Sequence, residues 1–197
     1  MQGNGVETIR IIINKKRTDI MRCHWVSDNP IYINYHDHEW GQHKTTTRDL
    51  FESLTLELMQ SGLSFLTVLK KREAFNRVFH QYDLEKLATR TDKDIALWLT
   101  DTSIIRHKKK LEAVVSNAAI VVSIEKHQSF YDYLLTLIER FLPDFELNDP
   151  RLDLDTCKKI AKQMKHHGFK FVGPTTLYSF FQATGFINDH DVTCHFR

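Results

Sequence analysis

The sequence has few of the residues that interrupt or crosslink a chain. Its 197 residues include only 7 glycines, 4 prolines and 3 cysteines. So few glycines and prolines exclude a collagen-like repeat and a turn-rich β fold. Three cysteines are too few for a disulfide framework. We therefore expect an intracellular, cytoplasmic protein whose thiols are free or bound to a metal.

Long apolar runs and a marked charge excess are also missing. No stretch approaches the roughly 18 to 20 consecutive apolar residues of a membrane-spanning helix, and the apolar patch at residues 9–13 is too short for a signal peptide. We expect no membrane contact. The 27 basic and 25 acidic residues leave a net charge of +2. This balance neither supports nor excludes a polyanionic partner, so local charge must decide.

Helical periodicity is what the sequence does contain. Apolar residues recur at helical spacing from Arg48 to about Gln60, Gly62 interrupts the pattern, and Thr91 with Asp94 forms a capping box. The predicted helices cover residues 48–60, 65–79, 91–99, 109–125, 129–141, 155–167 and 174–185. The sequence therefore predicts an all-α fold. We expect one domain over residues 21–197, and residues 1–20 as an extension that is disordered or a tag.

Four residues near the two ends of the chain are candidate metal ligands. Cys23 and His36 lie near the start, while His190 and Cys194 are separated by three residues near the end. Such a pair lies one helical turn apart, and thiolate with imidazole is a ligand set that zinc prefers. Four protein ligands leave no position for water, so the zinc would be structural and join the N-terminal segment to a C-terminal helix. The spacing also allows ordinary buried thiols and surface histidines.

A second pattern is a glycine-bounded turn among lysines. Gly168 and Gly173 flank a short hairpin that carries Lys170, and the preceding helix is lysine-rich. Backbone N–H groups at the start of a helix can bind a phosphate oxygen. We therefore expect Gly168, Lys170 and Gly173 to contact the DNA backbone, with a second basic cluster at residues 106–110. Both clusters could instead be solvated helix faces.

A third pattern combines aromatic residues with one carboxylate. The segment from residue 25 to 40 has no regular periodicity and contains Trp25, Tyr32, Tyr35 and Trp40. Aromatic rings outside a helical stripe can line a pocket for a flat extruded base. Glu57 lies at the edge of an apolar stripe, whereas Glu52 points the other way. Glu57 is either a paired structural group or a buried functional one.

Several ordered motifs resemble the DNA-3-methyladenine glycosylase I (Tag) family. The motifs are Met21-Arg22-Cys23, Tyr35-His36-Asp37, Glu39-Trp40-Gly41, Leu56-Glu57, Ser61-Gly62-Leu63-Ser64, Thr67-Val68-Leu69, Ile104-Ile105-Arg106-His107, Gly168-Phe169-Lys170 and Asn188-Asp189-His190. The match extends from about residue 21 to residue 194, which is nearly the whole chain.

The resemblance implies a fold and a set of roles. The fold would be the helix-hairpin-helix glycosylase fold, with two helical lobes beside a DNA-facing cleft. One structural Zn²⁺ per chain would bind Cys23, His36, His190 and Cys194. Glu57, as the catalytic residue, would surround the excised base together with Tyr32, Tyr35 and Phe65, with Trp25 and Trp40 nearby. Asp189 is a second candidate.

The implied activity is base-excision repair by a monofunctional enzyme. It would hydrolyse the N-glycosidic bond of 3-methyladenine in double-stranded alkylated DNA, leave an abasic site and act as a monomer. Phe65 departs from the family, which usually has tryptophan at this position. Two other readings are a non-catalytic, zinc-stabilised helix-hairpin-helix DNA-binding module, and a zinc hydrolase in which water replaces one of the four ligands.

Overall fold

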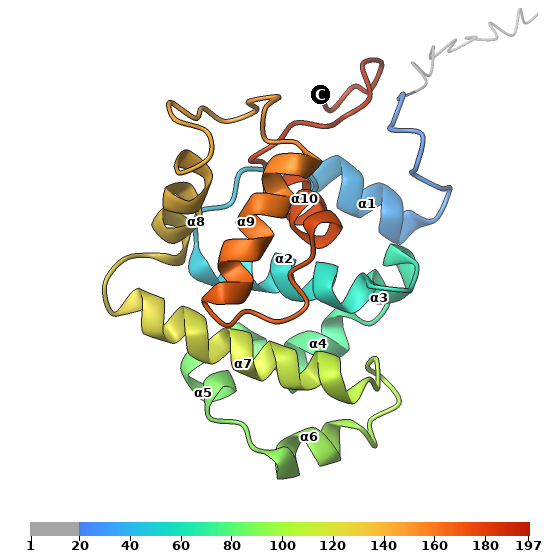
Figure 1. The fold of residues 1–197 in the computed structure, drawn as a ribbon. Coiled ribbons are helices and arrows are strands. Elements are labelled where there is room, and N and C mark those ends of the chain that lie inside the picture. The colour runs from blue at the N-terminus through green and yellow to red at the C-terminus, as the bar shows by residue number, and fades with distance from the viewer. Residues whose placement is uncertain (1–19) are drawn as a thin grey trace, which may run out of the picture.

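The computed structural model describes residues 20–197, and these residues form helices without a β-strand (Figure 1). The extension predicted at residues 1–20 thus lies outside the described residues, except for Ile20. The helices are α1 (Pro30–His38), α2 (Thr47–Gln60), α3 (Phe65–Leu69), α4 (Arg72–Val78), the 3₁₀ turn η1 (His80–Tyr82), α5 (Leu84–Ala88), α6 (Asp92–Trp98), α7 (Lys108–Glu125), α8 (Phe130–Glu139), α9 (Leu154–His166) and α10 (Pro174–Ala183). The all-α prediction is confirmed.

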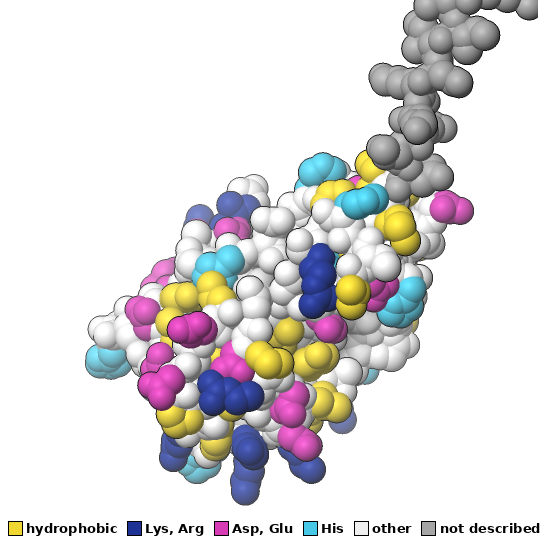
Figure 2. Space-filling model, turned by 90° about the horizontal axis from the view of Figure 1, so that it is seen from above, with side chains coloured by type: hydrophobic (Ala, Val, Ile, Leu, Met, Phe, Trp, Pro, Cys, Tyr) yellow, Lys and Arg dark blue, Asp and Glu magenta, His cyan; other side chains and the backbone are white. Residues whose placement is uncertain are grey.

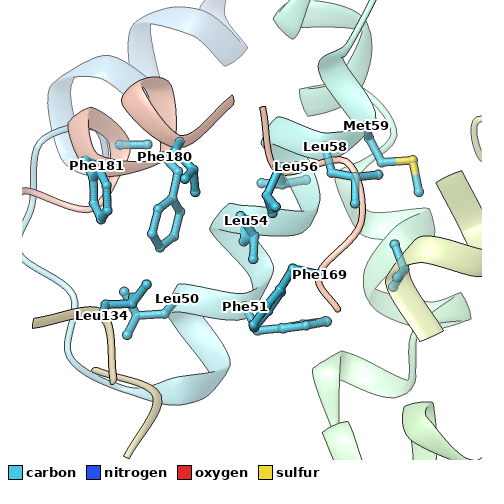
Figure 3. Packing of buried hydrophobic residues seen from close by; sticks show 14 of the residues in the cluster. Leu50, Phe51, Leu54, Leu56, Leu58, Met59, Leu134, Phe169, Phe180 and Phe181 are labelled. Atoms are coloured by element: carbon cyan, nitrogen blue, oxygen red, sulfur yellow. The ribbon is translucent and has the colours of Figure 1, made fainter. Parts of the chain in front are cut away.

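Helix α2 lies at the centre of the core. It begins where the Thr46 side chain accepts a hydrogen bond from the Asp49 N–H, as an N-cap residue does. Its apolar side chains are almost fully buried, and Figure 3 shows them meeting side chains of α8 and α10. Each buried leucine or phenylalanine contributes about 1.5–3 kcal/mol to folding. This burial fixes how α2 is rotated, and so which of its residues face a cavity.

The helices form two groups around α2. In Figure 1, helices α4 to α7 lie on one side, and α5 and α6 pack against α7. On the other side α9 packs against α10 and α8, and α1 lies near the C-terminal segment. Helix α2 contacts α7 of the first group and both α8 and α10 of the second. This arrangement agrees with the expected two helical lobes.

The predicted hairpin joins α9 to α10. Gly168 has a φ of +97°, a conformation that glycine adopts without strain, and the Phe169 N–H donates to the Met164 carbonyl at 3.0 Å. Asn117 of α7 binds the turn from the other side. Its Oδ1 accepts from the Lys170 N–H at 2.8 Å and its Nδ2 donates to the Lys170 carbonyl at 3.1 Å. The turn is thus held rigidly against α7.

Three local expectations were wrong. Residues 30–38, which lack an aliphatic stripe, form α1, because this helix presents aromatic rings and His36 rather than leucines to its neighbours. The single helix predicted at 65–79 breaks into α3 and α4 around Lys71, whose ψ is near zero. His190 and Cys194 do not lie on a helix, since the segment after α10 consists of turns.

The surface carries charges of both signs. On the face shown in Figure 2, lysine and arginine side chains alternate with aspartate and glutamate side chains, so this face has no patch of one sign. Within residues 20–197, none of the helices has both the length and the apolar character needed to cross a bilayer.

Candidate metal centre and aromatic pocket

The four predicted metal ligands come together in one buried cluster. The ligand atoms of Cys23, His36, His190 and Cys194 all lie within 4.8 Å of one another. His190 Nδ1 is 3.4 Å from both Sγ atoms, and His36 Nε2 is 3.5 Å from Cys194 Sγ. Sulfur and nitrogen ligands around a tetrahedral zinc ion are separated by about 3.5 Å. The cluster could therefore hold a metal ion. Because His36 and His190 are buried, the alternative that they are ordinary surface histidines is excluded.

A second layer of contacts orients the cluster. His36 Nδ1 lies 2.8 Å from Asp37 Oδ1, which leaves Nε2 for the cluster. Arg22 binds the same carboxylate with Nε at 2.8 Å and Nη2 at 2.6 Å. Although burial opposes it, hydrogen bonds from Arg22 and His36 lower the pKa of Asp37. A carboxylate behind a ligating histidine is the usual support of a metal ligand.

Two glycines allow the chain to close tightly around this cluster. A Cβ atom on Gly41 would lie 3.0 Å from His190 Nε2, and one on Gly185 would lie 2.6 Å from the His43 backbone nitrogen. Both glycines also have positive φ angles. Side chains at either position would push the C-terminal segment away from α1.

The predicted aromatic residues line a single cavity of about 260 Å³. All six predicted pocket residues take part, namely Trp25, Tyr32, Tyr35, Trp40, Glu57 and Phe65. They come from the N-terminal segment, α1, α2 and α3. The cavity is slightly below the roughly 300–1,000 Å³ of common ligand pockets. Its size and aromatic walls suit one flat ring system.

Glu57 is buried in this cavity without a partner. Glu57 is 7% exposed. Its carboxylate forms no hydrogen bond or ion pair with any group in residues 20–197. Burial raises the pKa of Glu57 to about 8, although the positive charge of Lys44 opposes the shift. Of the two possibilities that the sequence left open, a paired structural carboxylate is excluded.

Glu52 points away from the cavity, as its place on the helix predicts. It is nevertheless buried, at 8% exposed. Its Oε1 accepts from Arg72 Nε at 2.8 Å, and Arg72 Nη1 also donates to Glu39 Oε2 at 2.5 Å. Burial of Glu52 is possible because α4 packs close enough to α2 to supply Arg72 as a partner.

The wall of the cavity packs against the cluster of candidate metal ligands. The Trp25 ring meets the His36 ring edge to face at 5.3 Å, and the Trp40 ring meets that of His190 at 4.6 Å. The Tyr35 and Phe65 rings contact each other, with their centroids 5.1 Å apart. No third ring fits between them, so a bound base can touch both only from the cavity side. A change at the cluster will therefore move the pocket wall.

Three polar residues of the cavity were missed by the sequence analysis. Gln60 of α2 and Ser179 and Gln182 of α10 line it, but nothing in their sequence context distinguishes them from surface residues. Asp189, the second catalytic candidate, does not line the cavity. Its Oδ2 accepts a hydrogen bond from Nε2 of Gln182, which does line the cavity.

A wider cleft of about 570 Å³ opens from the same cavity. The two share Glu57, Gln60 and Ser179, and the cleft is otherwise lined by residues 61–64 and by Thr175 and Thr176 at the start of α10. Gly173 is the N-cap residue of α10, and Lys170 is exposed. The hairpin thus lies at one side of the cleft.

Comparisons with known proteins agree with this geometry. The family model for methyladenine glycosylase matches residues 25–197. The chain is 40% identical over 177 residues to DNA-3-methyladenine glycosylase 1 of Escherichia coli (strain K12), which corresponds to 88% of this chain and 95% of that protein. It superimposes on 3-methyladenine DNA glycosylase I of Staphylococcus aureus with a TM-score of 0.80 and 36% identity, covering 89% of this chain and 96% of that one. A variant of 3-methyladenine DNA glycosylase I solved in complex with 3-methyladenine gives a TM-score of 0.77 and 35% identity over 88% and 96% of the two chains. The chain therefore belongs to the methyladenine glycosylase family.

Proposed function

We propose that this protein is a monofunctional DNA glycosylase of base-excision repair that removes 3-methyladenine from alkylated double-stranded DNA. The observation that carries the proposal is the unpartnered, buried Glu57 in a cavity with aromatic walls. A buried carboxylate without a partner is costly unless a cation arrives to pair with it. Relatives named as 3-methyladenine DNA glycosylases support this choice of substrate.

The reaction follows from the charge of the damaged nucleotide. Methylation at N3 makes the adenine ring cationic while it is attached to deoxyribose, which weakens the N-glycosidic bond. When that bond breaks, its electron pair stays on the ring and the base leaves as a neutral molecule. A water oxygen then bonds to C1′ of the sugar and loses a proton, leaving an abasic site. The protein needs only to extrude the nucleotide and stabilise its charge.

The pocket residues divide this task. The Tyr35 and Phe65 rings would hold the cationic base by cation–π attraction, with Trp25, Tyr32 and Trp40 completing the wall. Ionised Glu57 would accept hydrogen bonds from the edge of the base and select the methylated form over ordinary adenine. Phenylalanine at position 65 offers a smaller ring and no N–H donor, so we expect a base to be bound more weakly than a tryptophan would bind it.

The wider cleft would receive the DNA backbone. Gly168, Lys170 and Gly173 at the hairpin, with the N–H groups at the start of α10, would bind phosphate oxygens. Leu63 is 42% exposed in the loop that lines the cleft. An apolar side chain at this place can fill the space that an extruded base leaves in the duplex.

Zinc fits the cluster of Cys23, His36, His190 and Cys194. Two thiolates and two imidazoles complete a tetrahedral shell without water, so the ion would have a structural role. When bound, it would hold the N-terminal segment, α1 and the C-terminal segment together behind the pocket wall. We further infer that residues 21–197 act as a single domain, and as a monomer in the cytoplasm, where thiols stay reduced.

Release of free base from methylated DNA tests the proposed function. Purified protein is incubated with methylated duplex DNA, and the released purines are separated by chromatography. We expect 3-methyladenine from the native protein and from Glu85→Gln, a control at an exposed carboxylate on α5, and little from Glu57→Gln. Folded protein that binds DNA but releases no base would support the DNA-binding module instead.

Metal analysis and chelation test the structural zinc. We expect about one zinc per chain, and a thermal unfolding temperature that falls when a strong chelator removes the metal. Base release should persist in EDTA as long as the metal stays bound. If the chelated protein keeps its unfolding temperature but loses all activity, the ion is catalytic. That result would support the alternative of a zinc hydrolase in which water replaces one ligand.

A further inference from the structure

Lys44 is a half-buried lysine close to the pocket but not part of its lining. It lies in the loop between α1 and α2, where its backbone N–H donates to the Thr184 carbonyl at 3.1 Å. Its Nζ donates to Ser53 Oγ at 2.9 Å. Within the described part of the chain it has no carboxylate within ion-pair distance. Its charge is therefore held in place by a neutral hydroxyl group rather than neutralised.

The position of Ser53 places this charge next to Glu57. The two residues are four positions apart on α2, so their side chains lie on the same helix face with Cβ atoms about 5–6 Å apart. Ser53 and Glu57 are 4% and 7% exposed. An ammonium bound to Ser53 thus acts on Glu57 across one turn of a buried helix, where charges interact more strongly than in bulk water.

Other groups around Glu57 offer no competing positive charge. Helix α1 contributes Tyr32 and Tyr35, whose pKa values are raised by burial first and by the charge of Glu57 in addition. Phe65 of α3 and Ser179 and Gln182 of α10 carry no charge. Among residues 20–197, Lys44 is the one charged group that opposes the effect of burial on the pKa of Glu57.

The surroundings of Lys44 itself include both signs of charge. Burial first, and then the positive charge of Arg72, lower the pKa of Lys44, while nearby acidic groups oppose this shift. Those acidic groups are Glu39, Glu52 and Asp49. Glu39 and Glu52 are bound to Arg72, whereas Lys44 binds Ser53, which lies one helical turn from Glu57.

We propose that Lys44 is a positioning residue that acts through Glu57, because its fixed positive charge allows the buried carboxyl to ionise before the cationic base arrives. The inference rests on the proposed function for its biological meaning. Lys44 is not part of the lining of the cavity or the cleft, so we expect it not to touch the base. Its effect should therefore appear in the protonation of Glu57 and not in the maximal rate.

Titration of Glu57 in the free protein tests the inference without any activity. The carboxyl carbons of glutamate are labelled with ¹³C, and the Glu57 resonance is assigned by its absence in Glu57→Gln. We expect the midpoint in Lys44→Met to lie about one pH unit above that of the native protein. Lys44→Arg should restore the native midpoint, and Lys93→Met, an exposed lysine on α6, should leave it unchanged. An unchanged midpoint in Lys44→Met would overturn the inference.

The pH dependence of kcat/KM for base release gives the functional readout. We expect the acid limb of Lys44→Met to move up by the same one unit, so that the rate below the limb falls about tenfold while the plateau above it is kept. A uniform loss at all pH values, without a shift, would mean a merely structural role and contradict the proposal. If the native protein released no base at any pH, the proposed function would fail, while the titration would still decide the role of Lys44.

Discussion

Helix α2 carries two buried carboxylates on opposite sides, and the contrast between them separates structure from function. On one side Glu52 binds Arg72, which also binds Glu39 at the end of α1. On the other side Glu57 faces the aromatic cavity and has no partner among residues 20–197. The two residues are 8% and 7% exposed. Burial is therefore the same, and only the presence of a partner differs.

The difference shows where each carboxylate finds its counter-charge. A buried charge must be paired to offset the cost of leaving water. Glu52 is paired within the fold, so it joins α1, α2 and α4. Glu57 is left for a partner from outside, and in the proposed function this partner is the cationic methylated base. Four measurements test whether the two carboxylates differ in this way.

Replacing the unpaired carboxylate should have the largest effect on activity. We expect Glu57→Gln to reduce kcat/KM for 3-methyladenine release by about 100-fold or more, because a neutral amide cannot stabilise the cationic base in a buried site. Single-turnover excision from methylated duplex DNA measures this change. A loss of less than about threefold would remove Glu57 from the role.

Replacing the paired carboxylate should instead reduce stability. We expect Glu52→Gln to lower the free energy of unfolding by about 3 kcal/mol, because Arg72 then loses its buried partner and keeps only the part-exposed Glu39. Urea unfolding followed by circular dichroism measures the change. The protein that remains folded should release base at nearly the native rate. A large loss of activity in fully folded Glu52→Gln would contradict the contrast.

The substitution at Glu57 should make the folded protein more stable. The carboxyl group has a pKa of about 8 when folded and 4.5 as its ordinary value. Between these two values the unfolded chain loses the proton and the folded chain keeps it, so the stability of the native protein falls as the pH rises from 4.5 to 8. Glutamine is free of this effect. We expect Glu57→Gln to gain about 3 kcal/mol at pH 7 in urea unfolding, and equal stability at pH 7 would argue against the raised pKa.

The activity itself should depend on pH through Glu57. Because the ionised form receives the base, we expect kcat/KM to fall about tenfold per unit as the pH drops below about 8. In kcat the same limb should lie at lower pH, since the bound cation lowers the pKa of Glu57 in the complex. Rates measured between pH 5 and pH 9 in buffers of constant ionic strength give both limbs. A flat profile of kcat/KM across this range would contradict the need for ionised Glu57.

Some local features could be predicted well because their causes lie close together in the sequence. The capping box of Thr91 and Asp94 forms as expected, and the helix predicted from residue 129 begins at the N-cap Ser129, since each of these caps joins residues three positions apart. Gly168 and Pro174 bound the hairpin because each sets its own backbone conformation, Gly168 with a positive φ and Pro174 as the first residue of α10. By contrast, α1 was missed because its inward face is aromatic, and the helix at 65–79 breaks because packing of α3 and α4 overrides local propensity.

By itself, the sequence determined which chemical groups the protein possesses and which short-range structures they form: four soft metal ligands, a glycine-bounded hairpin, a group of aromatic rings and the apolar stripe of α2. The tertiary structure alone decided which of these groups meet. Helical periodicity places Glu52 and Glu57 on different sides of α2, but it does not show that α4 brings Arg72 to one while α1, α3 and α10 enclose the other. The physical reason is that the environment of a charge is set by distances through space, and packing brings together residues that are far apart along the chain.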